Sequence, residues 1–408
     1  MLNILGPRGL PLFSTFFLWS FGTAGLHLAR PLFAASFGVP LVLVTLVSST
    51  AAVAHLVSGP LTGFALDRWG RRPLLILGLI VRGGTTGLEF FTDSYLQFLL
   101  LEFVGGMGVT MFITGSTVIL ADLSVVENRG RVVAVRSMAG RLGFVAGPFV
   151  AGAIAVVLEL RWVFLFNAAT KVMILAIVVL LIRETRPTPA AGEGARAEGH
   201  RLALSMFWTR AFVIIALVSF SLQMMNVGIF QSLFPVYLRS TDVFSTSDIG
   251  SFITIAAAAQ LLVTLPNGYL VDLYGRKSTL VPGLVVLAGA CWLLAGAGDY
   301  GTVLVMVIAY GVGEAACMGA AQAYAMDLAP EHRRGSFLGV WSLISSVGGA
   351  VAPLLVGLLG QQLGFGSAFV GVGAVMAGVG ALMFLFGPDT RARSRPPTIA
   401  ARGQEEVG

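Results

Sequence analysis

A ten-residue stretch of this chain occurs twice. Gly63–Arg72 reads GFALDRWGRR and Gly268–Lys277 reads GYLVDLYGRK, a shift of 205 residues from position 63 to position 268. The same shift relates Asp122 to Asp327. A register kept over so long a distance indicates two copies of one unit, each about half of the chain. Two similar halves can form a site at their interface that opens to either side in turn, which suits moving a solute better than changing it.

The composition predicts a membrane protein. Hydrophobic residues make up 56% of the chain and charged residues only 11%, whereas a soluble domain carries about 25% charged residues. So few charges cannot cover a water-facing surface, and a lipid bilayer is the expected outer solvent. The basic residues form no patch with interleaved aromatic side chains, so nucleic acid is not an expected partner. Cys291 and Cys317 lie in apolar runs and indicate neither a disulfide nor a metal site.

Twelve apolar segments are long enough to cross a bilayer as helices. They lie near 11–35, 41–65, 74–91, 95–120, 132–158, 162–182, 211–238, 247–271, 279–297, 302–326, 336–360 and 367–387. The expected fold is therefore an all-α membrane protein of two six-helix bundles around a central cavity. We divide the chain into an N-terminal bundle (1–182), a cytoplasmic linker (183–210), a C-terminal bundle (211–388) and a disordered cytoplasmic tail (389–408).

The arginines predict the orientation of the chain. They gather in one alternate set of gaps, as at Arg71 and Arg276, whereas the opposite set holds only Arg161 and Arg239. The positive-inside rule then places both termini in the cytoplasm. The chain uses arginine in place of lysine almost throughout, which is associated with GC-rich bacterial genomes. We expect a bacterial cytoplasmic (inner) membrane protein that is a monomer.

The repeated loop resembles the signature loop of the major facilitator superfamily, through the pattern G-x-x-x-D-R-x-G-R-R. Twelve spans, two repeats and a central linker agree with that resemblance, which covers nearly the whole chain. It implies a gating role for Gly63, Asp67, Gly70, Arg71, Arg72, Asp272, Gly275 and Arg276. The alternative is that these arginines only set the topology.

The chemistry of the loop residues suggests how they would act. Gly70 and Gly275 permit tight turns, and Gly63 and its counterpart Gly268 would permit close helix approach. The carboxylates of the two loops could meet arginines or a helix N-terminus of the opposite half. Such contacts would hold the cytoplasmic side closed.

Segment 132–158 carries Gly143, Gly147, Pro148 and Gly152. This pattern is similar to the antiporter motif of drug-efflux members of the family, although Ala151 replaces one of its final glycines. Small residues would let the second and fifth spans pack closely, and proline permits a bend. Ordinary helix packing is the alternative interpretation.

Charged residues inside the apolar segments are candidate functional groups, because an unpaired charge in hydrocarbon costs at least ~3 kcal/mol. Glu102 stands where many family members have an arginine. Arg82 in the preceding segment, or Arg141, is its expected ion-pair partner. Glu89 is a weaker candidate, since the resemblance places its helix at the periphery.

Glu102 and Glu314 are the candidates for proton coupling. Glu314 is nearly the only charge within the spans of the second half, and it shares a helical face with Tyr310 and Cys317. Burial disfavours the charged form of a carboxyl group, so either residue could carry a proton. The alternative for each is a static ion pair or hydrogen bond that joins two helices.

Further polar residues are expected to line the substrate cavity, because neutral polar groups in membrane helices face the interior. They are Arg30, Arg141, Gln223, Asn226, Gln231, Gln260, Tyr310 and Trp341. Arg30 lies near a helix end and could instead extend to water. His27 and His55 are interpreted as packed, hydrogen-bonded residues, and Arg136 as a group that reaches water or a loop.

The predicted function is secondary transport by alternating access, first as proton-coupled efflux of small amphipathic compounds. The alternative is uptake or exchange of a small organic anion or sugar-like metabolite, motivated by the buried arginines. A sensor or membrane enzyme is the third class, but neither a catalytic constellation nor a signalling domain supports it. The expected partners are a small-molecule substrate, protons and the lipid bilayer. No cofactor is expected, because the loops lack the glycine-lysine phosphate cradle of nucleotide sites.

Overall fold

The computed structural model describes residues 9–123, 129–182, 184–185, 209–330 and 334–388, and all regular structure within these ranges is helical. The first half contains α1 (Gly9–Ser36), α2 (Leu41–Trp69), α3 (Arg71–Glu89), α4 (Tyr95–Leu123), α5 (Arg129–Val157) and α6 (Trp162–Leu181). The second half contains α7 (Arg210–Gln223), η3 (Met224–Leu233), α8 (Phe234–Ser240), α9 (Thr246–Tyr274), α10 (Lys277–Ala295), α11 (Tyr300–Leu328), α12 (Arg334–Leu363) and α13 (Phe365–Phe386). Every predicted span coincides with a helix, to within a few residues at each end.

Eleven helices within the described ranges are long and apolar enough to cross a membrane. The predicted third span, α3, is not among them, because Arg71, Arg72, Arg82 and Glu89 make it much more polar. It nevertheless packs along α4 and α6, so neighbouring helices surround much of its charged surface. The predicted linker and tail lie almost wholly outside the described residues.

The seventh span is one continuous helix whose middle section has a different helical geometry. Its central ten residues, η3, form a π-helix between α7 and α8. A π-helix places residues five apart on one face, and the Gln231 Nε2 accordingly donates to the Asn226 Oδ1 at 2.5 Å. Such segments occur frequently at functional sites. Periodicity in the sequence did not predict this widening.

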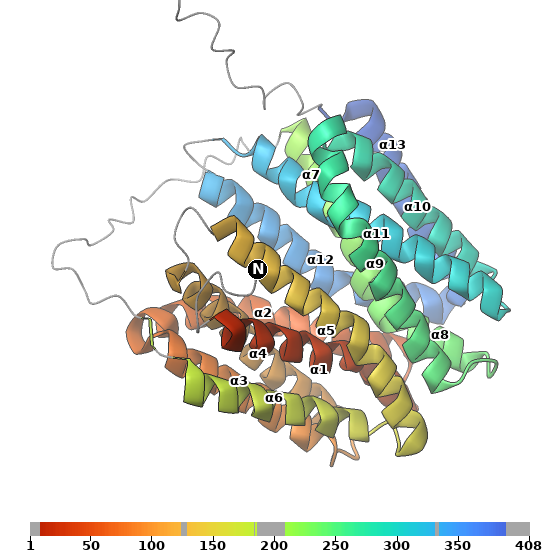
Figure 1. Ribbon diagram of the computed structural model, residues 1–408. Coiled ribbons are helices and arrows are strands. Elements are labelled where there is room, and N and C mark those ends of the chain that lie inside the picture. Colours follow the sequence, from red (N-terminus) through yellow and green to blue (C-terminus); the bar gives the residue numbers. More distant parts are fainter. Residues whose placement is uncertain (1–8, 124–128, 183, 186–208, 331–333, 389–408) are drawn as a thin grey trace, which may run out of the picture.

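The helices pack as two equivalent bundles, coloured red to yellow-green and green to blue in Figure 1. In the first bundle α3 packs on α4 and α6, and α1 packs on α5 and α6; the second bundle repeats these contacts with α10, α11, α13, the seventh span and α12. Between the bundles, α2 packs on α12 and α5 packs on α9. Since α9 and α12 are the repeats of α2 and α5, the interface has the pseudo-two-fold symmetry that the repeat predicts.

Close contacts between the halves occur at the end opposite the linker. The Val42 N–H donates to the Gln361 Oε1 at 3.2 Å, and the Ser232 Oγ donates to the Ser48 Oγ at 2.7 Å. Gly152 of α5 lies against Gly250 of α9, where an added Cβ would be 3.4 Å from the neighbouring Cα. These contacts join the halves at the end that carries the short loop 37–40.

The repeated loops turn where glycine is needed. Gly70 and Gly275 have φ values of 94° and 93°, a region that other residues rarely adopt. The predicted tight turns are therefore confirmed. Each turn leads directly into the next helix. At the first turn, Glu184 accepts hydrogen bonds from the Arg71 and Arg72 N–H groups at 3.1 and 2.9 Å. A carboxylate at this position also complements the positive end of the α3 dipole.

The two loops also repeat an ion pair. The Arg71 Nε lies 3.2 Å from the Asp122 Oδ2, and the Arg276 Nε lies 3.0 Å from the Asp327 Oδ2. Each pair joins a loop to the end of α4 or α11 in its own half. A contact of the loop carboxylates Asp67 and Asp272 with the opposite half stays a prediction, and the Asp272 side chain lies outside the described residues.

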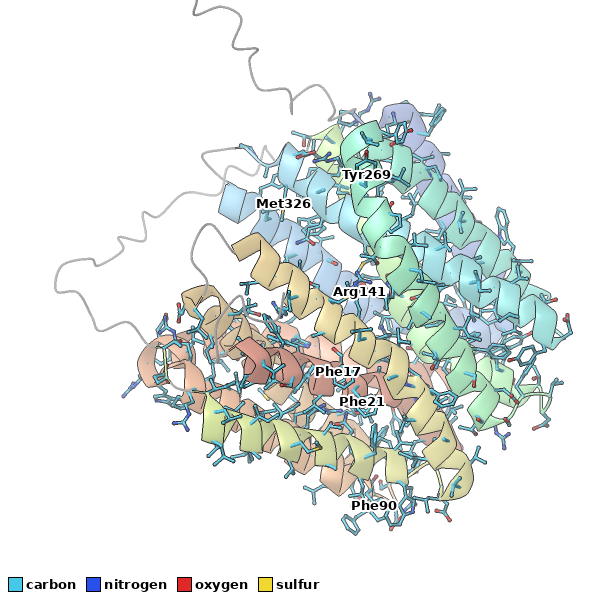
Figure 2. The ribbon with its side chains drawn as sticks, viewed as in Figure 1. Phe17, Phe21, Phe90, Arg141, Tyr269 and Met326 are labelled. Carbon is cyan, nitrogen blue, oxygen red and sulfur yellow. The ribbon has the colours of Figure 1, made fainter. Side chains whose placement is uncertain are left out.

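Two packing expectations are wrong. An added Cβ at Gly63 or Gly268 would meet no atom within 4 Å, so neither glycine supports a close helix approach. The α5 glycines contact α1 rather than α2: a Cβ at Gly143 or Gly147 would collide with a backbone carbonyl of α1. Figure 2 marks Phe17 and Phe21, which supply these carbonyls. Glycine is required here because two helix backbones touch.

Replacement of Gly143 by alanine is expected to destabilise the protein by about 1–3 kcal/mol, because the added methyl group must displace the α1 backbone. Thermal melting of the purified protein in detergent measures this effect. Gly63→Ala is the matched control and should not lower the melting temperature, since its site is open and alanine favours helix. Equal melting of both variants would contradict the proposed role of Gly143.

Candidate functional site

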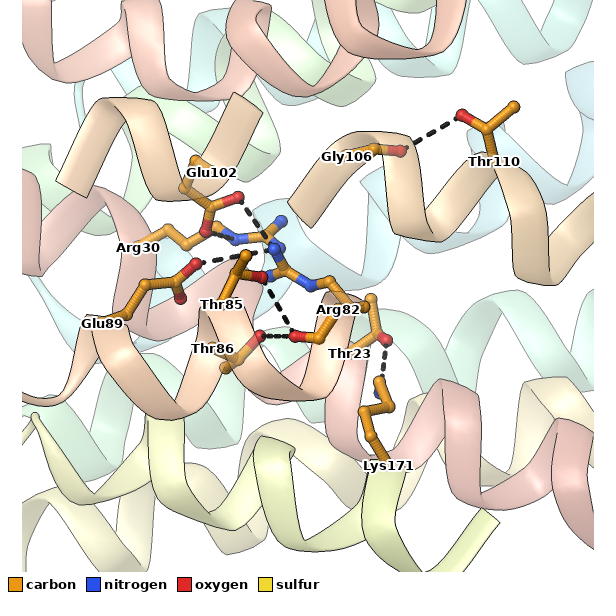
Figure 3. A network of polar contacts seen from close by, with 10 residues as sticks. All are labelled: Thr23, Arg30, Arg82, Thr85, Thr86, Glu89, Glu102, Gly106, Thr110 and Lys171. Carbon is orange, nitrogen blue, oxygen red and sulfur yellow. Dashed lines mark hydrogen bonds and ion pairs between the residues drawn. The ribbon is translucent and has the colours of Figure 1, made fainter. Parts of the chain in front are cut away.

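A cluster of buried charges occupies the interior of the first half (Figure 3). The Arg30 Nε lies 2.5 Å from the Glu102 Oε1. The Arg82 Nη1 lies 3.4 Å from the Glu102 Oε2 and 3.5 Å from the Glu89 Oε1. Glu89 and Glu102 are fully buried. The four groups compensate one another, as buried charges must.

These contacts change several expectations. Glu102 does pair with Arg82, but its closest partner is Arg30, which therefore neither extends to water nor lines a cavity described below. Arg141 takes no part in this cluster. Glu89 is buried rather than peripheral, because α3 turns this face toward α4. The peripheral position expected for α3 did not predict that one face of this helix, the face with Glu89, is buried.

Lys171 adds a third buried cation. Its side chain comes from α6, and the Nζ donates to the Thr23 Oγ1 at 3.2 Å and to the Trp19 carbonyl at 3.5 Å. The ammonium also lies 4.3 Å from the centre of the Trp19 ring. Among the described residues no carboxylate pairs with it. Backbone carbonyl, hydroxyl and ring electrons replace a counter-ion.

A second polar site lies in the other half around Glu314 of α11. The Glu314 Oε1 accepts a hydrogen bond from the Asn226 Nδ2 at 2.7 Å, and the same amide also donates to the Tyr310 hydroxyl at 3.2 Å. The Glu314 Oε2 is buried and has no hydrogen-bond partner. The π-helix holds Asn226 and Gln231 together beside this carboxyl group.

Arg141 brings the first half to this site. Figure 2 shows it on α5 near the centre of the molecule, where the halves meet. Its guanidinium interacts electrostatically with Glu314. Arg141 is only partly buried, so the pair is not a closed contact like that of Arg30 with Glu102. A carboxyl group of one half therefore faces a cation of the other.

Two cavities between the halves adjoin this polar site. A small enclosed cavity of about 40 Å³ is lined by His27, Phe144, Asn226, Gln231, Gln260 and Tyr310, among others. A more open cavity of about 290 Å³ is lined by Ser48, His55, Gln223, Gln231 and Gly349, among others. Gln231 of the π-helix lines both. Each cavity takes residues from both repeats, as expected for a site at a pseudo-symmetric interface.

The predicted cavity residues fall into two groups. Gln223, Asn226, Gln231, Gln260 and Tyr310 line these cavities as expected. Arg30, Arg141 and Trp341 do not. The Trp341 Nε1 donates to the Ser219 Oγ at 2.8 Å, the Arg30 guanidinium pairs with Glu102, and Arg141 lines neither cavity.

Two lining residues were missed by sequence reasoning. His27 packs as predicted, with its ring 5.3 Å from that of Phe144, and it also lines the small cavity. His55 does make the expected hydrogen bond, because its Nδ1 lies 2.8 Å from the Thr110 Oγ1, and it also lines the larger cavity. A polar residue in a cavity-facing helix was the available signal for both.

Comparison with known proteins agrees with this arrangement. The family model described as Major Facilitator Superfamily matches residues 12–245 and 217–406, once for each half. The chain belongs to the major facilitator superfamily. It is thus a multi-pass membrane transporter of small molecules, with the superfamily's all-α fold of two six-helix bundles.

Individual relatives within the superfamily are distant but extensive. The chain is 25% identical over 312 residues to Multidrug resistance protein 1 of Bacillus subtilis (strain 168), covering 76% of this chain and 78% of the relative. It is 22% identical over 351 residues to the cis,cis-muconate transport protein of Acinetobacter baylyi, covering 83% and 84%. The chain thus resembles the drug-efflux branch of the superfamily, although relatives of other specificity match as well.

A solved structure supports the fold. The D-xylose-proton symporter superposes with a TM-score of 0.76 at 18% identity, covering 94% of this chain and 98% of that one. At this identity the likeness concerns the fold alone. The loop motif and the helix-5 glycines, on which the sequence resemblance rested, correctly indicated the superfamily.

Replacement of Glu102 by glutamine is expected to destabilise this superfamily member by about 3–5 kcal/mol, because Arg30 and Arg82 would lose the carboxylate that compensates them. Thermal melting in detergent again measures the effect. Asp93→Asn is the matched control: Asp93 pairs with Arg161 at 3.0 Å, but its side chain is 83% exposed. Surface ion pairs contribute little, so a similar loss in both variants would contradict a structural role for Glu102.

Proposed function

We propose that this protein exports small amphipathic compounds in exchange for protons, by alternating access across a bacterial cytoplasmic membrane. The observation that carries the proposal is Glu314. It is a buried carboxyl group with one unpaired oxygen, next to a cavity between the halves and opposite a cation of the other half. Perturbed titratable groups in such a setting are candidates for function.

The proposed coupling is electrostatic. When Glu314 is charged, it attracts Arg141 across the interface, and a proton on Glu314 removes that attraction. Protonation therefore changes the relative free energy of states that differ in the separation of the halves. A substrate that binds between the halves and favours the charged form would compete with the proton, and this linkage is reciprocal.

The two candidate carboxylates are not equally suited to this role. Glu102 is held by two guanidinium groups, so taking up a proton would leave those cations uncompensated. Glu314 has one neutral amide donor at 2.7 Å and a more distant cation. These surroundings support Glu314 as the proton carrier and a structural role for Glu102.

The proposed orientation places both termini and the linker in the cytoplasm. The close contacts between halves then lie at the outer end, between α2 and α12 and between α5 and α9. This is consistent with an inward-facing state. Alternation would require these contacts to separate while contacts form at the opposite end. The small residues Gly152 and Gly250 suit such an interface, because they leave little side-chain interdigitation to break.

Exchange or uptake of an organic anion remains the second candidate. Arg30 and Arg82, which motivated it, are already paired with carboxylates and support it less than expected. Arg141 supports it, as a partly accessible guanidinium at the interface. The relative whose name specifies muconate transport agrees with this alternative.

Proteoliposomes with an imposed pH gradient test the proposal. The liposome interior is made acidic, and an amphipathic compound is added outside. With the unaltered protein, protons should leave the interior, and an enclosed pH dye should record a rise of internal pH. Glu314→Gln should abolish proton movement, because the amide cannot take up a proton, while compound binding remains. Glu159→Gln, at an exposed loop position, is the matched control and should behave as the unaltered protein. Compound flux that ignores the gradient, or proton movement that persists in Glu314→Gln, would refute the coupling.

A further inference from the structure

A third cavity lies wholly within the first half, between α1, α4 and α5. Its volume is about 280 Å³, and its lining includes Phe16, Trp19, Phe112, Arg136, Ser137 and Gly140. It shares no lining residue with the two cavities at the interface.

Aromatic rings form the apolar wall of this cavity. The Trp19 and Phe112 rings stack with centres 3.8 Å apart and planes 9° apart. Phe16 meets Phe112 edge-on, with ring centres 6.5 Å apart. All three side chains are largely buried, so their neighbours hold them in place. A rigid aromatic wall favours a flat, unsaturated ligand over a flexible one.

The same cavity is positively charged. The Arg136 guanidinium lies 4.5 Å from the centre of the Phe16 ring and, within the described part of the chain, pairs with no carboxylate. Arg136 is predicted to reach water or a loop; its side chain is partly exposed and lies along this wall. The Lys171 ammonium approaches the Trp19 ring. No acidic residue is among those that line the cavity.

The cavity has an exposed side along α5. Ser137 lines it and is exposed, and Arg141 lies one helical turn further along the same face of α5. Arg141 interacts with Glu314 of the second half, so this face of α5 is directed at the interface. Gly140 keeps the cavity wide, because an added Cβ would lie 3.2 Å from the Ser20 Oγ across it.

We propose that this cavity binds an aromatic carboxylate, with the ring against Trp19, Phe112 and Phe16 and the carboxylate on Arg136. This assigns the substrate class and therefore rests on the proposed transport function. Guanidinium pairs with carboxylate through two parallel hydrogen bonds, and no carboxylate among the described residues pairs with Arg136. The volume lies just below the usual range for ligand pockets and suits a one- or two-ring compound. An organic cation is disfavoured by the positive charge of Arg136.

Binding of 2-naphthoate to the full-length protein in nanodiscs, measured by calorimetry, tests this proposal. Two other probes separate charge from shape: 2-naphthamide keeps the ring without the charge, and decahydro-2-naphthoate keeps the charge without the flat ring. Each should bind at least about tenfold more weakly than 2-naphthoate. The proposal would be overturned if the unaltered protein bound the acid and the amide with equal affinity, or if it did not bind naphthoate.

Variants then locate the site. Arg136→Gln should remove the preference for the acid over the amide, and Arg136→Lys should restore part of it, because the charge returns without the planar fork. Arg210→Gln is the matched control, since that guanidinium also lies over a ring, 4.7 Å from the centre of Phe386, but outside the cavity. A tenfold preference that survives in Arg136→Gln would place the anion elsewhere.

The same measurements separate this proposal from proton coupling. Glu314→Gln should lose proton movement yet keep its preference for naphthoate, because Arg136 is intact. If naphthoate binds as expected but moves no protons in the unaltered protein, the coupling fails and the binding site stands. If proton movement responds to compounds but the acid and amide bind alike, the binding site fails and the coupling stands.

Discussion

The helix packing of the first half of this protein depends on the carboxylate of Glu102. It lies in an apolar interior and receives a guanidinium from α1 and another from α3, at 2.5 and 3.4 Å. Each of these three charges would be very costly alone in a membrane. Together their ion pairs join α1, α3 and α4, so α3 can remain in the bundle despite its polar composition. Glu89 joins the same network through Arg82, which lies on the same helix, α3.

The second half is organised differently, and the difference suggests a division of labour. Its interior has Glu314 with one neutral hydrogen-bond partner, Asn226, and a π-helix that widens the seventh span beside it. A carboxyl group held this loosely can change its charge without breaking a network. In the proposed mechanism the first half is a fixed body that presents Arg141, and the second half carries Glu314, the group whose charge varies. The repeat preserved the helices and the loop ion pairs but not the interior chemistry.

Backbone contact, rather than side-chain bulk, determines how the helices meet. Gly143 and Gly147 let α5 touch the α1 backbone, and Gly152 lets it touch α9 in the other half. One helix therefore joins the first bundle firmly and the second through a smooth surface. The cavity lined by Trp19 and Arg136 lies on the same helix, nearer the linker end. A ligand there would lie next to the surface along which the halves must move.

The sequence by itself determined the number and limits of the spans, the two-fold repeat and the superfamily, because hydropathy, spacing and loop glycines are local properties. It also identified Gln223, Asn226 and Gln231 as cavity residues, since polar groups in apolar helices must face inward. Only the tertiary structure decided which charges meet. Arg30 joined Glu102, Trp341 turned to Ser219, and Arg136 lay along an aromatic wall. These outcomes depend on the rotation and distance of helices that are far apart in sequence, and no local pattern encodes that geometry.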